Sequence, residues 1–308
     1  MTLGFPDLSG GSVLTVGTFD GVHIGHREIL NDLNACVSRT GLPGLVVTFT
    51  PHPLAVVNPS AAPQLLTPQS ERLAELAGMT APSRAVVLPF SPALATLSPE
   101  EFVRLLADRY RMRELVVGYD HGLGRGRQGD VSVLRSLGAR LGFKVHVVPA
   151  KHDEHGTAIS STAIRRAVAY GELDVARGML GRPYALSGIV VRGSSRGRGI
   201  GVPTINLELA REKLLPPGGV YAVRVSSAKG SFGGMMNLGG RPTFGEAERV
   251  PEIHLFGASG DWYGDAVSAQ FVAKLRDTVR FAGVKELTEQ IARDAIAVKA
   301  VLGTEWNK

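Results

Sequence analysis

The chain has 308 residues and a formal net charge of +6, and 44% of its residues are hydrophobic while 20% are charged. This length predicts about two domains, the composition excludes a largely disordered chain, and the single cysteine, Cys36, excludes an intramolecular disulfide and any zinc site built on cysteines. No run of Lys and Arg exceeds two residues, so the positive charge gives only weak support to a nucleic-acid partner and suits an enzyme with polyphosphate substrates equally well.

The first half of the chain alternates strand-like and helix-like segments. Short runs rich in Val and Leu predict strands at residues 12–17, 44–50, 84–89, 114–119 and 143–148. Helical spacing and capping residues predict helices at 23–40 and 69–78, from the capping box at Ser98 to near Arg113, and from Asp130 to Gly142. This rhythm predicts a doubly wound parallel sheet with helices on both faces.

Residues 40–70 carry no Asp, Glu, Lys or Arg, a feature that membrane segments share. Six prolines in this stretch argue against a membrane helix, and we expect a strand followed by a long loop. The first ten residues show no basic segment before an apolar run, so no signal peptide is expected. We therefore expect a cytoplasmic protein.

Beyond about residue 182, strand-like runs follow one another without intervening helices. They lie at residues 184–192, 219–225, 234–238, 251–256 and 266–275, and a helix at 285–302 closes the chain. This series predicts a small antiparallel β-barrel with a closing helix. We place the domain boundary within residues 178–183, which gives domains 1–182 and 183–308.

The string GTFDGVHIGH at residues 17–26 joins the first predicted strand to the first predicted helix. In an open α/β sheet this junction lies at the carboxyl edge, where ligands bind. His23 and His26 are three residues apart at a helix start, so they share a face beside the positive end of the helix dipole and suit phosphate groups. A histidine pair alone is more often solvated surface. The whole string, however, resembles the signature of the nucleotidylyltransferase superfamily, which transfers a nucleotide monophosphate from ATP or CTP.

Two further segments resemble that superfamily. The run VGYD at 117–120 ends the fourth strand at the same sheet edge, and ISSTAIR at 159–165 places hydroxyl groups at a helix start. Simple N-capping explains Ser160 equally well, and a lone Arg165 is also compatible with a surface charge. The resemblance implies ATP contacts for Gly17, Phe19, Asp120, Ser161, Thr162 and Arg165.

In the second half, the segment GVPTINL at residues 201–207 alternates two polar side chains with Ile205. On an extended segment Thr204 and Asn206 point to one side, and a hydroxyl with an amide oxygen suits Mg²⁺. From the spacing alone, two polar residues on the solvent-exposed face of a strand explain the pattern better than a Mg²⁺ site does. Glu252 lies on the strand face opposite Ile253, and a lone glutamate there is usually solvated.

Together the two halves resemble the prokaryotic bifunctional riboflavin kinase/FAD synthetase family over nearly the whole chain. In the first half the resemblance is carried by GTFDGVHIGH, TFTPHP (48–53), LSPEEF (97–102) and ISSTAIR. In the second half it is carried by LGRPY (180–184), GVPTINL, GGVYAV (218–223), NLGGRPTFG (237–245), PEIHL (251–255) and WYG (262–264). It implies an N-terminal nucleotidylyltransferase domain and a C-terminal riboflavin kinase-like barrel.

For the barrel, the resemblance implies that Thr204 and Asn206 hold Mg²⁺ and ATP. Gly193 and Gly201 are implied to contact ATP from a loop rich in Gly and Arg. Glu252 is implied to be the base that removes the proton of the riboflavin 5′-hydroxyl, whose oxygen then attacks the γ-phosphate of ATP to give FMN.

For the first domain, the resemblance implies adenylyl transfer from ATP to FMN, which gives FAD and pyrophosphate. His23, His26 and Arg165 are implied to steady the negative charge. Phe49 and His52 are candidates for contacts with the isoalloxazine ring, because they lie near one ligand edge.

One segment departs from the family pattern. The family usually has G-x-D-F-x-F-G after the fourth strand, whereas residues 118–124 read GYDHGLG, so His121 and Leu123 replace two aromatic residues. A riboflavin kinase with a weakened adenylyltransferase site therefore stays open. A non-catalytic flavin- or nucleotide-binding protein and a basic nucleic-acid binder stay open as well. The partners implied by the favoured interpretation are riboflavin, FMN, FAD and ATP, with no nucleic acid or membrane, and the sequence indicates no oligomeric state.

Overall fold

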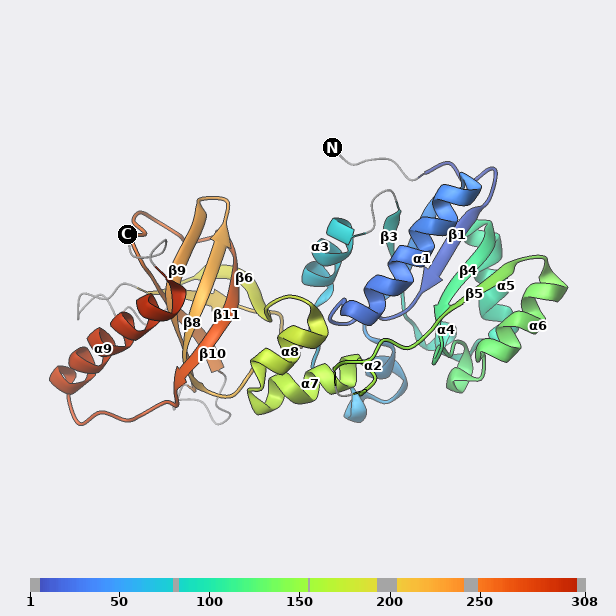
Figure 1. Ribbon diagram of the computed structural model, residues 1–308. Coiled ribbons are helices and arrows are strands. Elements are labelled where there is room, and N and C mark those ends of the chain that lie inside the picture. Colours follow the sequence, from blue (N-terminus) through green and yellow to red (C-terminus); the bar gives the residue numbers. More distant parts are fainter. Residues whose placement is uncertain (1–5, 80–82, 155, 193–203, 241–248, 304–308) are drawn as a thin grey trace. The chain divides into compact units, whose positions relative to one another are not determined.

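The computed structural model describes residues 6–79, 83–154, 156–192, 204–240 and 249–303 (Figure 1). The chain divides into two compact units, Met1–Ile164 and Arg165–Lys308. The boundary predicted at residue 182 stays a prediction.

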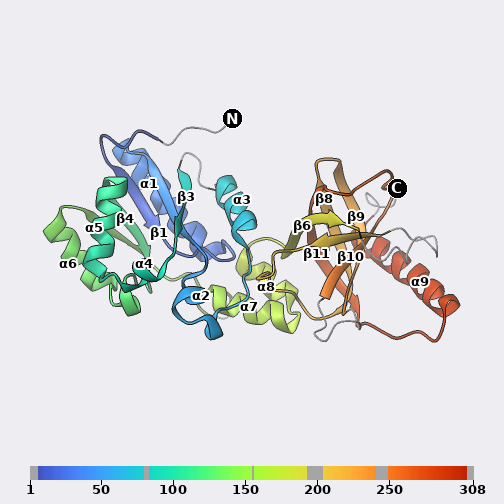
Figure 2. The same cartoon turned by 180° about the vertical axis from the view of Figure 1, so that it is seen from behind.

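The first unit is built on a five-stranded parallel sheet. Its strands are β1 (Ser12–Val16), β2 (Gly44–Thr50), β3 (Arg84–Pro89), β4 (Met112–Gly118) and β5 (Lys144–Val148), which confirms all five predicted strands. The strand order is β3-β2-β1-β4-β5, and every pair is parallel. Figures 1 and 2 show the unit from opposite sides. The chain winds outward from β1 to β3 and then returns to the other side of β1 as β4. The carboxyl ends of β1 and β4 therefore form the topological switch point, where open α/β sheets bind ligands.

Six helices lie wholly in this unit, and one begins in it, among the residues that the structure describes. They are α1 (Ile24–Thr40), α2 (Pro53–Val57), α3 (Gln69–Met79), α4 (Pro92–Thr96), α5 (Pro99–Tyr110), α6 (Val131–Leu141) and α7 (Ser161–Tyr170), with short 3₁₀ turns η1 (Pro59–Ala61) and η2 (Arg125–Arg127). The loop expected after residue 50 thus contains α2 and η1, which both begin at a proline. The helix expected to reach Arg113 ends at Tyr110, because Arg111 adopts a left-handed conformation with φ 50° and β4 starts at once.

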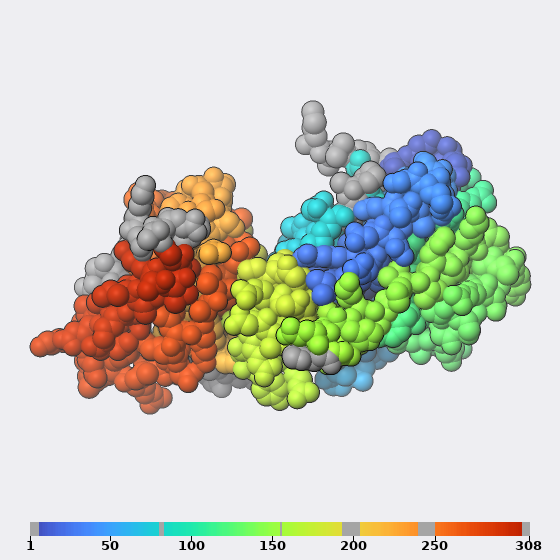
Figure 3. Space-filling model, viewed as in Figure 1, coloured from blue at the N-terminus to red at the C-terminus, as the bar shows by residue number. Residues whose placement is uncertain are grey.

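Alternating strand residues fill two cores, one on each face of the sheet. Val13, Val46 and Val116 pack with α1 and α3, while Leu14, Val47 and Leu115 pack with α5 and α6. The outer face of α1 carries exposed polar residues such as Asn31 and Asp32, and this helix reaches the surface in Figure 3. The predicted sheet with helices on both faces is confirmed.

The second unit contains α8 (Leu173–Leu180) and a closed antiparallel barrel. The barrel strands are β6 (Ala185–Val191), β7 (Ile205–Glu208), β8 (Gly219–Ser227), β9 (Gly230–Gly240), β10 (Arg249–Leu255) and β11 (Ala266–Arg276), in the order β10-β7-β6-β11-β8-β9. The predicted barrel is confirmed. β8 and β9 extend beyond their predicted ends because they pair continuously as a hairpin up to Ser227 and Gly230.

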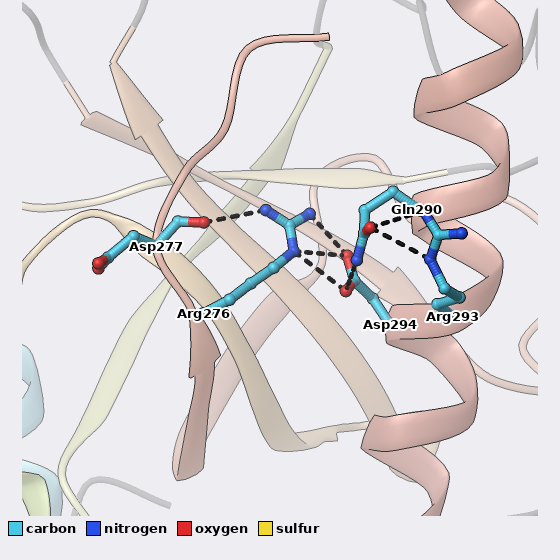
Figure 4. A network of polar contacts seen from close by, with 5 residues as sticks. All are labelled: Arg276, Asp277, Gln290, Arg293 and Asp294. Carbon is cyan, nitrogen blue, oxygen red and sulfur yellow. Dashed lines mark hydrogen bonds and ion pairs between the residues drawn. The ribbon is translucent and has the colours of Figure 1, made fainter.

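The last helix, α9 (Val284–Leu302), closes the barrel as predicted. Val298 and Leu302 pack on Val220 and Met235. At the edge of this contact the Arg276 guanidinium donates to both carboxylate oxygens of Asp294, with Nη2–Oδ2 at 2.6 Å (Figure 4). Asp294 is 5% exposed, so this bidentate ion pair ties β11 to α9 in a largely dry setting.

Candidate functional sites

The loop between β1 and α1 has an unusual backbone. Phe19 and Val22 have φ values of 50° and 39°, and Gly21 has 83°. Left-handed conformations are costly for side chains of this size, and they persist where surrounding contacts impose them, often at functional sites. Phe19 and Val22 are 2% and 0% exposed, so packing fixes the loop in this shape.

Hydrogen bonds from two distant segments hold the same loop. The carboxylate of Asp20, which is fully buried, accepts from the backbone N–H groups of Leu66 at 3.1 Å and Thr67 at 2.9 Å. The Gly21 N–H donates to Thr67 Oγ1 at 2.8 Å, and the Ser161 hydroxyl donates to the Asp20 carbonyl oxygen at 2.8 Å. Sequence reasoning assigned no role to Asp20 or Thr67. The structure shows that they shape the loop from which the histidines project.

The two histidines of the motif lie together at the start of α1. His23 is the N-cap residue, and its Nδ1 accepts from the His26 backbone N–H at 3.3 Å, which leaves its proton on Nε2. The two rings stack with centroids 3.6 Å apart, and Phe19 lies 5.1 Å from the His26 ring. A Cβ on Gly25 would lie 3.2 Å from the His23 ring, so the glycine makes room for it. The prediction that both histidines share a face at the helix start is confirmed.

Gly17 and Asp120 reach the same sheet edge from neighbouring strands. Gly17 follows β1 directly, and Asp120 lies two residues beyond the end of β4. The Asp120 carbonyl oxygen accepts a hydrogen bond from Arg127 Nη2 at 2.9 Å, and Asp120 itself is exposed. The switch point thus brings the GTFDG loop and the loop after β4 together, as the parallel topology requires.

His121 and Leu123, the two departures from the family pattern, face inward. Leu123 is 6% exposed and pairs with Gly129 across a short antiparallel bridge. The Nε2 atom of His121 is buried without a hydrogen-bond partner among the described residues. Burial, helped by the positive charge of Arg127, lowers the pKa of His121 to about 4, so its imidazole is neutral near pH 7.

The hydroxyl groups at the start of α7 have different surroundings. Ser160 Oγ accepts from the Ala163 N–H at 3.2 Å, which is a capping contact, whereas Ser161 holds the Asp20 carbonyl as described. Thr162 is exposed, and Arg165 lies one turn further along α7. The ATP contacts of Ser161, Thr162 and Arg165 stay predictions.

The two flavin candidates lie at the carboxyl end of β2. Phe49 is the last residue but one of this strand, and His52 lies two residues beyond its end. Phe49 is 8% exposed and belongs to the core, where it packs edge-on against Phe90 at 5.4 Å. His52 caps α2, with its Nδ1 accepting from the Leu54 N–H at 3.2 Å. Their contact with a flavin ring stays a prediction, and the packing of Phe49 leaves little of its ring exposed.

In the barrel, three polar residues lie side by side on adjacent strands. Asn206 of β7 is directly opposite Glu252 of β10, and Glu252 is in turn opposite Asn237 of β9. Directly opposed residues of an antiparallel pair share a sheet face, with Cβ atoms about 5 Å apart. Ile205 and Ile253, which alternate with them, are 9% and 0% exposed and face the barrel interior. The polar row therefore lies on the outer face.

The structure thus brings together Asn206 and Glu252, two residues 46 positions apart in sequence. Thr204 is exposed and precedes β7, in the alternation that places it on the side of Asn206. Asn237 was missing from the predicted site, although the NLGGRPTFG motif contains it. The predicted Gly193 and Gly201 lie outside the described residues.

The oxygen atoms of Asn206, Glu252 and Asn237 are suitable ligands for a hard divalent cation. Asn206 is 5% exposed, and its amide oxygen Oδ1 is buried with no hydrogen-bond partner among the described residues. A buried carbonyl oxygen without a partner is costly unless something binds it. Amide and carboxylate oxygens are ligands that Mg²⁺ accepts, so the residues present fit this ion.

Comparisons with known proteins match both units of the chain. Residues 6–163 match the FAD synthetase family, and residues 180–302 match the riboflavin kinase family. A bifunctional riboflavin kinase/FMN adenylyltransferase of Escherichia coli (strain K12) is 38% identical over 95% of this chain and 93% of its own length. The corresponding enzyme of Bacillus subtilis (strain 168) is 33% identical over 92% and 90%.

A solved structure resembles the whole fold. The crystal structure of a macrolide-efflux protein from Streptococcus pneumoniae is 31% identical, covers 96% of this chain and 95% of its own, and has a TM-score of 0.83. A shared fold does not identify an activity, so this likeness does not assign macrolide efflux to the chain. Among the described residues, each helix is too short or too polar to cross a membrane.

Proposed function

Because the chain belongs to the family of bifunctional riboflavin kinase/FMN adenylyltransferases, and makes FMN and then FAD with ATP, we propose how its own residues divide the two reactions. The barrel performs the kinase reaction, and the carboxyl edge of the parallel sheet performs the adenylyl transfer. We assign the predicted domains 1–182 and 183–308 to these two tasks. The observation that carries the assignment is the pairing of Asn206 with Glu252 on the barrel's outer face.

In the kinase reaction, Glu252 acts as the general base. Its carboxylate accepts the proton of the riboflavin 5′-hydroxyl while the hydroxyl oxygen attacks the γ-phosphorus of ATP and ADP leaves. A partly buried strand position supports this role, because the pairing with β7 and β9 on both sides fixes the backbone of Glu252. We propose that Asn237, its other cross-strand neighbour, orients the carboxylate or the substrate hydroxyl.

We assign the Mg²⁺ site to Thr204 and Asn206. The buried amide oxygen of Asn206 and the hydroxyl of Thr204 would hold the ion, which when bound neutralises charge on the phosphates of ATP. Placing the oxygen ligands beside the base brings the nucleophile and the nucleotide to one face of the barrel. Gly193 and Gly201 are proposed to contact ATP from the loop before β7.

In the adenylyl transfer, an oxygen of the FMN phosphate attacks the α-phosphorus of ATP, and pyrophosphate leaves. We propose that His23 and His26 donate hydrogen bonds to the phosphates, His23 through its Nε2–H, at the positive end of α1. Gly17 and Phe19 line the nucleotide in the left-handed loop, and Asp120 contacts it from the end of β4. Ser161, Thr162 and Arg165 are proposed to contact the phosphates from α7, and Phe49 and His52 to lie near the flavin.

Family membership favours this assignment over a kinase-only enzyme and over a non-catalytic binder. The loop with His121 and Leu123 follows β4 at the switch point, so we propose that it retains the nucleotide site with different packing. We also propose a cytoplasmic location, since ATP is the co-substrate of both reactions. Riboflavin, FMN, FAD and ATP are the proposed partners.

A chromatographic assay of the flavins tests the assignment. Purified protein incubated with riboflavin, ATP and Mg²⁺ should yield FMN and FAD. Glu252→Gln should abolish the conversion of riboflavin to FMN and leave that of added FMN to FAD intact, whereas His26→Ala should do the reverse. His254→Gln, on the same face of β10 two residues away, is the matched control and should retain FMN formation. If Glu252→Gln still phosphorylated riboflavin at the normal rate, the assignment of the base would be wrong.

A further inference from the structure

Three potential metal ligands gather at the amino edge of the parallel sheet. Cys36 comes from the last turn but one of α1, Glu114 from the start of β4 and His146 from β5. The register pairs Glu114 with Lys144 and Val116 with His146, so Glu114 and His146 both lie on the sheet face that α1 covers. The fold therefore brings the three side chains to one point from three elements.

The geometry of this cluster is close to what a tetrahedral cation needs. One ligand atom from each residue lies within 4.8 Å of the other two, and the His146 Nε2 is 2.9 Å from Glu114 Oε2. The ligand atoms of a bound zinc ion lie about 3.3–3.8 Å apart, so His146 Nε2 and Glu114 Oε2 have to move apart slightly, while a pair near the 4.8 Å limit has to close by about 1 Å. Cys36 and Glu114 are 7% and 4% exposed, whereas the His146 side chain is 34% exposed and leaves an open side for a water ligand.

We propose that Cys36, Glu114 and His146 form a binding site for a zinc-class divalent cation, with one thiolate, one carboxylate and one imidazole ligand. This mixed set suits Zn²⁺ and Co²⁺ better than Mg²⁺, which prefers oxygen ligands. This proposal departs from the expectation that a single cysteine excludes any zinc site built on cysteines, because one thiolate can share a cation with a carboxylate and an imidazole.

Arg39 is the competitor for this site. Its guanidinium lies 2.5 Å from Glu114 Oε2, and its side chain is 50% exposed, so it can turn into solvent when a cation takes its place. Lys144 is 4.0 Å from the other carboxylate oxygen and adds repulsion. On binding, the S–H bond of Cys36 breaks, a sulfur–metal bond forms and the proton passes to solvent, at a cost because burial raises the pKa of this thiol. We therefore expect binding to strengthen when Arg39 is removed.

The site is separate from the nucleotide edge. Glu114 lies four residues before Gly118 in β4, which is about 13 Å along the strand. α1 (Figure 1) joins the two places, because its N-cap is His23 and Cys36 lies one turn before its end at Thr40. A bound cation would fasten the far end of this helix to the sheet without touching the reacting groups.

Cobalt titration of the full-length, tag-free protein tests the proposal. Cys36 is the only cysteine, so a thiolate-to-cobalt charge-transfer band in the near ultraviolet reports this site alone. We expect the band to appear with Co²⁺, to disappear on addition of Zn²⁺ and to be lost in Cys36→Ser. His146→Ala should weaken Co²⁺ binding by roughly tenfold or more, since one ligand is gone, and Arg39→Gln should tighten it.

The controls separate binding from folding. His152→Ala removes an exposed histidine outside the cluster and should leave the titration unchanged. His146→Ala replaces a partly exposed side chain, so it serves even if Cys36→Ser does not fold. Absence of the thiolate band in both the natural protein and Arg39→Gln would overturn the proposal, as would a band that His146→Ala leaves at full strength.

Discussion

The buried imidazole of His121 predicts a specific pH dependence of stability. Its Nε2 is enclosed after β4, and burial together with Arg127 lowers the pKa of the group to about 4 from its ordinary value of 6.5. In the unfolded chain the same side chain is exposed and titrates near the ordinary value. His121→Phe restores the aromatic residue of the family pattern and removes this titration.

The direction and size of the change in stability with pH depend on how many protons the folded and unfolded chains bind. Between pH 6.5 and pH 4 the unfolded chain binds a proton at His121 and the folded protein does not, so stability falls as the pH falls. This loss is negligible above about pH 7, reaches about 2 kcal/mol at pH 5 and is about 3 kcal/mol at pH 4. The variant lacks this contribution, while its other titrating groups are unchanged.

Urea denaturation followed by circular dichroism at pH 7 and pH 5 measures the difference. The free energy of unfolding of the natural protein should fall between the two values by about 2 kcal/mol more than that of His121→Phe. His121→Leu is a second variant in case the larger ring does not fit, and it should behave in the same way. Equal pH dependence in the natural protein and in both variants would refute the reasoning.

Four further substitutions should alter activity or stability in one unit of the chain. Asn206→Ala should raise the Mg²⁺ concentration needed for half-maximal FMN formation and leave FMN-to-FAD conversion unchanged; an unaltered Mg²⁺ titration would contradict the assigned ligand. Asp20→Ala should destabilise the first unit by about 2 kcal/mol in urea melts, because two backbone donors lose their acceptor, and should lower FAD synthesis but not FMN synthesis. Asp294→Ala should destabilise the second unit by about 3 kcal/mol, whereas the exposed Glu289→Ala should change it little; similar melts for both would show that the ion pair is dispensable. Gly25→Ala should displace the His23 ring and reduce adenylyl transfer, with kinase activity as the internal control.

Local patterns in the sequence were sufficient to predict the helices and strands and the position of the histidine pair at the start of α1. The Val- and Leu-rich runs, the capping box at Ser98 and the GTFDGVHIGH string each depend on neighbouring residues, so they predicted β1 to β5, the start of α5 and the start of α1. The barrel followed in the same way from successive strand-like runs.

Contacts between distant segments were not predictable in this way. Asp20 meets Thr67 across 47 positions, and Asn237 meets Glu252 only because β9 and β10 pair in one register. Similarly, the end of α5 at Tyr110 depends on the single left-handed residue Arg111, which no periodic pattern announces. The environment of His121 depends on the packing of a whole loop, so its lowered pKa had no signal in the sequence.

The barrel places chemistry and packing on alternate residues of the same strands. Glu252 faces outward, while its neighbour Ile253 fills the interior, and Asn206 and Ile205 repeat the arrangement on β7. A shift of β10 by one position would bury the carboxylate and expose the isoleucine, so an out-of-register barrel would be both unstable and inactive. The same separation means that the interior can be redesigned for heat resistance without altering the reacting groups.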